Sequence, residues 1–269
     1  LLHYVIVNEV PWPPRDATGF SSKRINAVST DSVFPLKFLA SVFVDAESEV
    51  YTEELAEDLR ERLGDDFSNI VPYQDPDDGT TRTVLLKPKS GLAVGLRGHR
   101  FDVEQVATDA RDSLPEVKEF CVNTNEIFPE TAELVRVGRP HRIEFVQESF
   151  WETPDTGKFG NRLLNLPLKA ESDSGNLAEW KWRLNYRESL QVSGTEEGLN
   201  RITTVESGGT VVNVEDTELK GIRITYDIST LKEKTRNRFT NERQSQFFEK
   251  MPEVRQGLEN EFSEVVNNE

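Results

Sequence analysis

An alternation of apolar and polar residues between positions 178 and 187 limits the folds open to this chain. Apolar residues occupy every second position, at Ala178, Trp180, Trp182, Leu184 and Tyr186, and charged or polar residues lie between them. Side chains of a β-strand point alternately to its two faces, so this period of two predicts a strand with one buried and one exposed face. Such strands are typical of antiparallel sheets that meet water on one side.

Further strands are expected around this segment. In the strand over 219–228, isoleucines and a tyrosine take one face while Arg223 and Asp227 take the other. Glycine-containing turns, among them Ser207-Gly208-Gly209, separate the expected strands. These strands are 162–169, 199–206, 210–214 and 219–228.

The C-terminal segment predicts a helix. Its apolar residues recur every three or four positions, at Phe247, Met251, Val254, Leu258, Phe262 and Val265. Pro252 lies within this stripe, and because proline removes a backbone donor we expect a kink or two helices in series. A helix after a run of antiparallel strands is expected to cover one face of their sheet.

The first part of the chain predicts a different order of elements. An extended, proline-rich arm over 1–33 is followed by a buried strand over 34–45 and a helix over 51–63, which Gly64 can terminate. The segments 81–87 and 92–96 predict a hairpin.

A second helix is expected to begin at Asp102, a suitable N-cap. The apolar residues of its predicted face are Val103, Val106, Ala107, Ala110 and Leu114. The segment 121–130 is polar, and extended chain is expected over 134–146.

Together these elements predict an α+β fold in two halves, each a mainly antiparallel sheet packed by helices. The long C-terminal helix is expected to cover the second sheet. We place the boundary within 148–160, which gives an α+β half over 34–150 and an antiparallel sheet plus helix over 151–269.

The net charge, the apolar runs and the cysteine content limit the partners and the cellular compartment to be expected. The chain of 269 residues carries a net charge of −16, which disfavours general binding to nucleic acid. Its longest apolar run, 38–44, falls far short of the roughly 20 residues of a membrane-spanning helix, so no membrane association is expected. The single cysteine, Cys121, allows no intrachain disulfide and favours a cytoplasmic location.

No motif for a metal or cofactor stands out in the sequence. The three histidines are isolated and no CxxC or HExxH sequence occurs, so no zinc site is expected. The glycines of 91–98 lack the spacing of nucleotide-binding loops. Cys121 follows Phe120, which favours a small buried hydrophobe over a nucleophile. We therefore expect no cofactor.

Basic residues supply the candidate binding site. They lie on strands of the second half, most of them on the face opposite the apolar stripe, and would form an anion-binding patch of Arg183, Arg187, Arg223, Lys181 and Arg201. Arginine suits bidentate contact with carboxylate or phosphate. The alternative is cross-strand pairing of these cations with Glu179, Glu188 or Asp227.

A second basic run precedes the terminal helix. Its members are Lys232, Lys234, Arg236, Arg238 and Arg243. This run is typical of a solvated linker, and it also suits contact with a phosphate backbone or an acidic partner.

The layout resembles a known family. A strand with Phe34-Pro35-Leu36, an acidic helix, a hairpin, a second helix and a strand over 134–139 precede a half that ends with Tyr226-Asp227-Ile228 and a long helix. This order is similar to that of a sporadically distributed, functionally uncharacterised family of bacterial proteins, over residues 34–266. The chain departs from that pattern in its proline-rich arm and at Arg139-Pro140-His141. The resemblance implies no catalytic residues.

We expect a cytoplasmic binding or interaction module of a bacterial stress or defence system, with a protein partner and with an Arg-bearing sheet face that binds an anionic ligand. Two alternatives stay open. One is a metal-dependent or carboxylate-based phosphoesterase, or other small-molecule enzyme, acting between the halves, which converging carboxylates would favour. The other is a nucleic-acid-associated protein, which an open groove with unpaired Arg183, Arg187 and Arg223 would favour.

Overall fold

A computed structural model describes most of the chain beyond residue 32. The described residues are 33–45, 53–64, 66–74, 81–87, 90–97, 99–107, 114–135, 139–153, 156–163, 179–212, 218–234 and 238–267. The extended arm predicted for 1–33 therefore lies outside them, apart from Val33.

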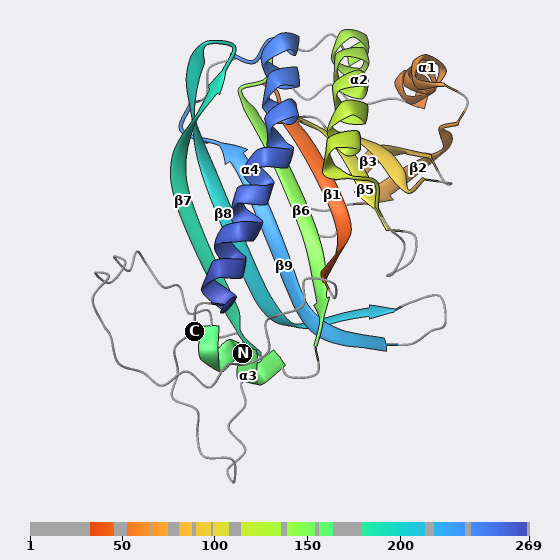
Figure 1. Cartoon of the computed structure of the whole chain (residues 1–269). Coiled ribbons are helices and arrows are strands. Elements are labelled where there is room, and N and C mark those ends of the chain that lie inside the picture. The colour runs from red at the N-terminus through yellow and green to blue at the C-terminus, as the bar shows by residue number, and fades with distance from the viewer. Residues whose placement is uncertain are drawn as a thin grey trace.

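These residues form nine strands and four helices (Figure 1). In chain order the elements are β1 (Val33–Phe43), α1 (Glu53–Leu63), β2 (Ser68–Gln74), β3 (Thr81–Lys87), β4 (Leu92–Arg97), β5 (Arg100–Val106), α2 (Val117–Val135), β6 (Arg142–Glu152), α3 (Thr156–Leu163), β7 (Lys181–Val192), β8 (Thr195–Val212), β9 (Glu218–Thr230) and α4 (Asn241–Asn267).

Several predicted elements are confirmed. The first strand is β1, the first helix is α1, and the hairpin is the antiparallel pair β3 and β4. Helix α1 ends at Gly64, whose φ of 102° lies in the left-handed region that favours glycine. The Gly64 amide donates to the Arg60 carbonyl oxygen at 3.0 Å, which closes the last turn.

All nine described strands belong to one antiparallel sheet, in the order β2-β3-β4-β5-β1-β6-β9-β8-β7. Strands β1 and β6 pair at its centre, with Ala40 opposite Phe145. Both residues are fully buried, and the ring of Phe145 packs against that of Phe120 of α2, with 6.2 Å between the centroids.

The α+β class is thus confirmed, whereas the two expected sheets are a single one. The described strands before β6 lie on one side of the β1–β6 pair and those after it lie on the other. Strand β6 runs to Glu152, and a domain boundary within 148–160 stays a prediction.

Helices α2 and α4 lie side by side across one face of the sheet (Figure 1). Aromatic rings fill the space beneath them, and Phe128 of α2 lies 5.5 Å from Phe248 of α4 between ring centroids. Burying a side chain of this size stabilises the fold by about 1.5–3 kcal/mol. The predicted C-terminal helix on the sheet is confirmed, and it continues through Pro252 as one element.

The helix predicted from Asp102 is wrong at its start, because Arg100–Val106 is strand β5. Ala107 and Leu114 belong to no helix, and residues 108–113 lie outside the described part of the chain. Phe101 and Val103 are fully buried in the core, while Arg100 donates to Asp102 on the opposite face, with its Nη2 2.7 Å from Oδ2. The alternation of strand residues therefore outweighs the helical spacing of the valines and alanines.

The second helix of the chain is instead α2, which covers the polar segment 121–130, where no helix was predicted. It also includes residues 134 and 135, the start of the segment 134–146 that was expected to be extended. Thr124 and Thr131 are fully buried in it. Their hydroxyls donate to the carbonyl oxygens of Phe120 and Ile127, each at 2.9 Å, so these threonines can face the core.

Strand β8 is also longer than predicted. It joins the expected strands 199–206 and 210–214, and Ser207-Gly208-Gly209 is a bulge where the pairing with β9 shifts, not a turn. The strand expected over 162–169 begins inside helix α3, and residues 164–169 lie outside the described part of the chain.

Candidate interaction site at the sheet edge

The candidate binding residues gather around β7, which ends the sheet on one side (Figure 1). Trp182 lies toward α4, with its ring 6.4 Å from that of Phe262. Since strand residues alternate, Lys181, Arg183 and Arg187 take the face turned away from α4. The face of this strand that was predicted to be buried is covered in part by α4. The face that was predicted to be exposed is called the open face.

A single carboxylate separates two of the predicted cations. Lys181, Glu206 and Arg223 are direct neighbours on β7, β8 and β9. Lys181 Nζ lies 3.0 Å from Glu206 Oε2, which is a cross-strand pair of the kind considered as the alternative. The three side chains together therefore carry one net positive charge.

Arg187 and Arg201 have different environments. Arg187 Nη2 lies 3.1 Å from Glu233 Oε1, and both side chains are about two-thirds exposed (65% and 64%). Arg201 lies on the face toward α4, where it is buried and pairs with Glu188 and with Glu261, the latter at 2.8 Å. It fastens β8 to α4 and is not on the open face.

Arg183 is exposed on the open face of β7, near the start of the strand. Its positive charge reaches Asp227 on β9, whose pKa is raised by burial and lowered in part by Arg142 and Arg183. Burial and the nearby Asp227 also raise the pKa of Glu144. Toward the centre of the sheet the open face thus carries carboxylates together with cations, and Arg142 Nη2 lies 3.2 Å from Glu144 Oε2.

The two edges of the sheet differ. Edge strand β2 contains Pro72, and its pairing with β3 shifts between Ser68 and Ile70, two features that blunt an edge. Strand β7 has 12 residues without proline or glycine and pairs with β8 in unbroken register. No described strand lies beyond β7, so this edge presents a row of backbone N–H and C=O groups.

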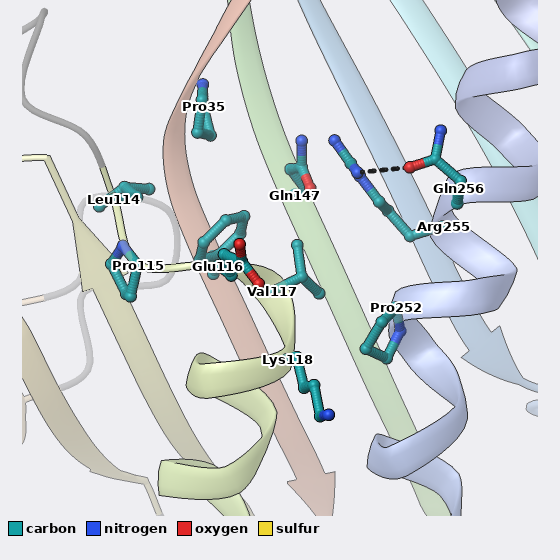
Figure 2. Close-up of a pocket in the computed structure, with 11 residues that line it drawn as sticks. Pro35, Leu114, Pro115, Glu116, Val117, Lys118, Gln147, Pro252, Arg255 and Gln256 are labelled. Atoms are coloured by element: carbon teal, nitrogen blue, oxygen red, sulfur yellow. Dashed lines mark hydrogen bonds between the residues drawn. The ribbon is translucent and has the colours of Figure 1, made fainter.

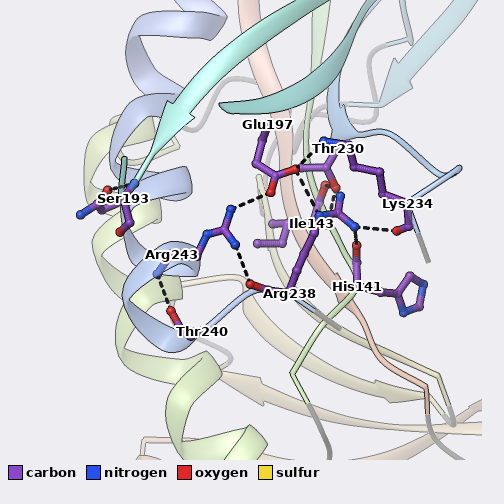
Figure 3. Close-up of polar contacts among 10 residues, drawn as sticks. His141, Ile143, Ser193, Glu197, Thr230, Lys234, Arg238, Thr240 and Arg243 are labelled. Carbon is purple, nitrogen blue, oxygen red and sulfur yellow. Dashed lines mark hydrogen bonds and ion pairs between the residues drawn. The ribbon is translucent and has the colours of Figure 1, made fainter. Parts of the chain in front are cut away.

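The second basic run surrounds a carboxylate (Figure 3). Glu197 is only 2% exposed. Its carboxylate accepts hydrogen bonds from Arg243 Nη2 at 2.6 Å and Arg238 Nε at 3.1 Å, and Lys234 Nζ lies 3.4 Å away. This cluster attaches the start of α4 to the β7–β8 hairpin. Arg238 and Arg243 are thus held largely inside the fold, whereas Lys234 and Lys232 are exposed and Arg236 lies outside the described residues.

Other candidate chemistry finds little support. Cys121 is the buried residue expected, and burial raises the pKa of its thiol to about 12, so the nucleophilic thiolate does not form at neutral pH. Within the described ranges no three His, Cys, Asp or Glu side chains gather as a metal ion requires. No helix in this part of the chain is long and apolar enough to cross a membrane.

The sequence gives no indication that β7 lies at an edge, because pairing with distant strands decides strand order. The absence of proline and glycine over 181–192 is equally compatible with a central strand. No protein-family model matches the chain, and no curated protein matches it. The resemblance to the uncharacterised bacterial family therefore stays a prediction.

Proposed function

We propose that this protein is an interaction module that takes up an acidic, extended segment of a partner protein along the outer edge of β7. The observation that carries the proposal is an unblunted 12-residue edge strand that itself places three cations and no carboxylate on its open face. Two of these cations have exposed or half-exposed partners on other segments, Glu233 and Glu206, with which an acidic partner segment would compete. In strand addition, main-chain hydrogen bonds supply affinity and alternate side chains supply specificity.

The two faces of β7 define the pattern of the partner. On the open face, acidic side chains of the partner would lie opposite Lys181, Arg183 and Arg187, where each opposite-charge pair contributes roughly 0.2–1 kcal/mol. On the other face, apolar side chains would extend the surface of Trp182 and Tyr186, the latter 41% exposed. The partner segment should therefore alternate acidic and apolar residues.

A second copy of the chain fits this edge less well. Antiparallel pairing of two β7 strands centred on Asn185 would set Arg183 of one copy against Arg187 of the other, and like charges directly opposite destabilise a pair. The net charge of −16 does not prevent the binding of an acidic segment, because the Debye length of about 8 Å at physiological salt confines the interaction to local charges.

The test is a fluorescence anisotropy titration with a labelled peptide of about ten residues that alternates Glu and Val. We expect the wild-type protein to bind it, and the variant R183E/R187E to bind at least about tenfold more weakly, a loss of about 1.4 kcal/mol. The control variant R60E/R62E changes the net charge equally on α1 and should bind like the wild type.

A peptide methylated at alternate backbone nitrogens separates strand addition from simple charge attraction. Methylation removes the main-chain donors and leaves the charge unchanged, so binding should be lost. Equal binding of the methylated peptide, equal weakening by R60E/R62E, or a wild-type dimer that pairs through β7 would each refute the proposal.

A further inference from the structure

A cavity of about 370 Å³ lies on the helix-covered face of the sheet, away from β7. Its walls come from β1, β6, the start of α2 and the middle of α4 (Figure 2). This volume is at the small end of the range for ligand sites, roughly 300–1,000 Å³. The cavity is therefore large enough for a small organic molecule.

The apolar part of the wall is rigid. It includes Pro35, Pro115 and Pro252, and Phe38, which is 1% exposed. Proline side chains lose almost no rotamer entropy when they are covered, and a buried ring is already fixed. Such walls are preorganised to hold a compact molecule.

Two side chains that line the cavity each have a buried polar atom without a partner among the described residues. Gln147 is 1% exposed, and its Nε2 donates to Ser149 Oγ at 2.8 Å while its Oε1 accepts nothing. Arg255 donates through Nη2 to Glu259 Oε1 at 3.0 Å, while its Nε–H is unpaired. Because a buried polar group without a hydrogen bond is costly, each atom calls for a partner.

The charges that line or adjoin the cavity cancel. Glu116 and Lys118 both line it, and the guanidinium of Arg255 is neutralised by Glu259. A charged ligand would therefore lose its hydration without gaining a counter-ion. A neutral ligand avoids that cost.

We propose that this cavity binds a neutral, planar lactam or cyclic amide of about the size of a nucleobase. Its N–H donates to Gln147 Oε1, its carbonyl oxygen accepts from Arg255 Nε, and its ring lies against Phe38 and the prolines. The two unpartnered atoms, one acceptor and one donor, are the complement of an amide edge. This inference does not depend on the peptide site at β7.

The test uses uracil and 2-piperidone as probes, with binding followed by ligand-detected NMR. We expect both to bind the wild-type protein, and 1,3-dimethyluracil, which has lost its N–H donors, to bind at least about tenfold more weakly. The variant Q147L should weaken uracil binding by a similar factor, and the matched control Q191L, on the exposed part of β7, should not.

A second variant keeps the test decisive if Q147L fails to fold. R255K retains a positive charge to face Glu259 but removes the Nε–H donor, so uracil binding should again fall about tenfold. Failure of uracil and 2-piperidone to bind the wild type would overturn the proposal, since water alone would then satisfy the two atoms. Equal binding of uracil by the wild type and by the folded variants would overturn it too.

Discussion

Replacing Glu197 with Gln removes the single negative charge that three cations share. The shape of the side chain is nearly kept, so the effect comes from the charge. Lys234 is 46% exposed and water screens it, whereas the side chains of Arg238 and Arg243 are only 13% and 16% exposed. Removing one partner of a buried pair costs about 3–5 kcal/mol, because the remaining charge is left uncompensated. Because E197Q leaves the poorly solvated guanidinium groups of Arg238 and Arg243 without their carboxylate, we expect its loss of stability to fall in this range.

The measurement is urea unfolding followed by circular dichroism. We expect E197Q to lose about 3 kcal/mol or more, and its Tm to fall by roughly 6 °C or more. The matched control is E206Q on the same strand, whose partner Lys181 is 47% exposed, and it should lose only about 0.2–1 kcal/mol. Equal losses in the two variants would mean that solvent compensates Arg238 and Arg243, and the reasoning would be refuted.

Three further predictions concern the core and the open face. A Cβ on Gly221 would lie 2.1 Å from the Trp151 carbonyl oxygen, so G221A should lower the free energy of unfolding in urea by about 1–3 kcal/mol. The control G257A on α4 should raise it by about 0.5–1 kcal/mol. Equal effects of the two variants would contradict this prediction. Cys121 should react with iodoacetamide at pH 8 only after urea unfolds the protein, and rapid labelling of the native protein would argue against its buried thiol. Because burial raises the pKa of Asp227 in the folded state, its ionisation destabilises the fold as pH rises, so D227N should raise the unfolding free energy at pH 7 and lose this gain below about pH 4; a gain independent of pH would count against it.

Elements with an uninterrupted period could be predicted from the sequence. In β9 the inward residues Ile222, Ile224 and Ile228 are all buried, and in α1 the stripe ends at a glycine that adopts the expected backbone conformation. In both cases the local pattern and the tertiary environment agree, so the burial of one face fixes the element.

Elements whose burial depends on distant partners could not be predicted. The core face of α2 contains Thr124 and Thr131, whose polarity hides the helical period because their hydroxyls bond within the helix. Glycines at 208 and 209 suggest a turn, and only the partner strand β9 shows that they form a bulge.

The two candidate sites could likewise be predicted only in part, because they too depend on distant segments. The sequence identifies the cations of β7, but their availability depends on partners such as Glu206 and Glu233, which lie on other segments. Gln147 is one of many polar residues in the sequence. Its significance arises only because β6 places its amide in a cavity beneath α2 and α4.

The central pairing of β1 with β6 has a consequence for how the chain folds. Phe38 of β1 pairs with Gln147 of β6, which follows it in the sequence by about 110 residues. Its partner on the other side, Gln105 of β5, precedes Gln147 in the sequence and is therefore synthesised earlier. Contacts between such distant segments slow folding, because loop closure must precede them. During synthesis β1 therefore keeps one unsatisfied edge until β6 emerges, and at about 5–20 residues per second this lasts several seconds. During this interval another chain can pair with the unpaired edge of β1, which exposes the nascent chain to aggregation.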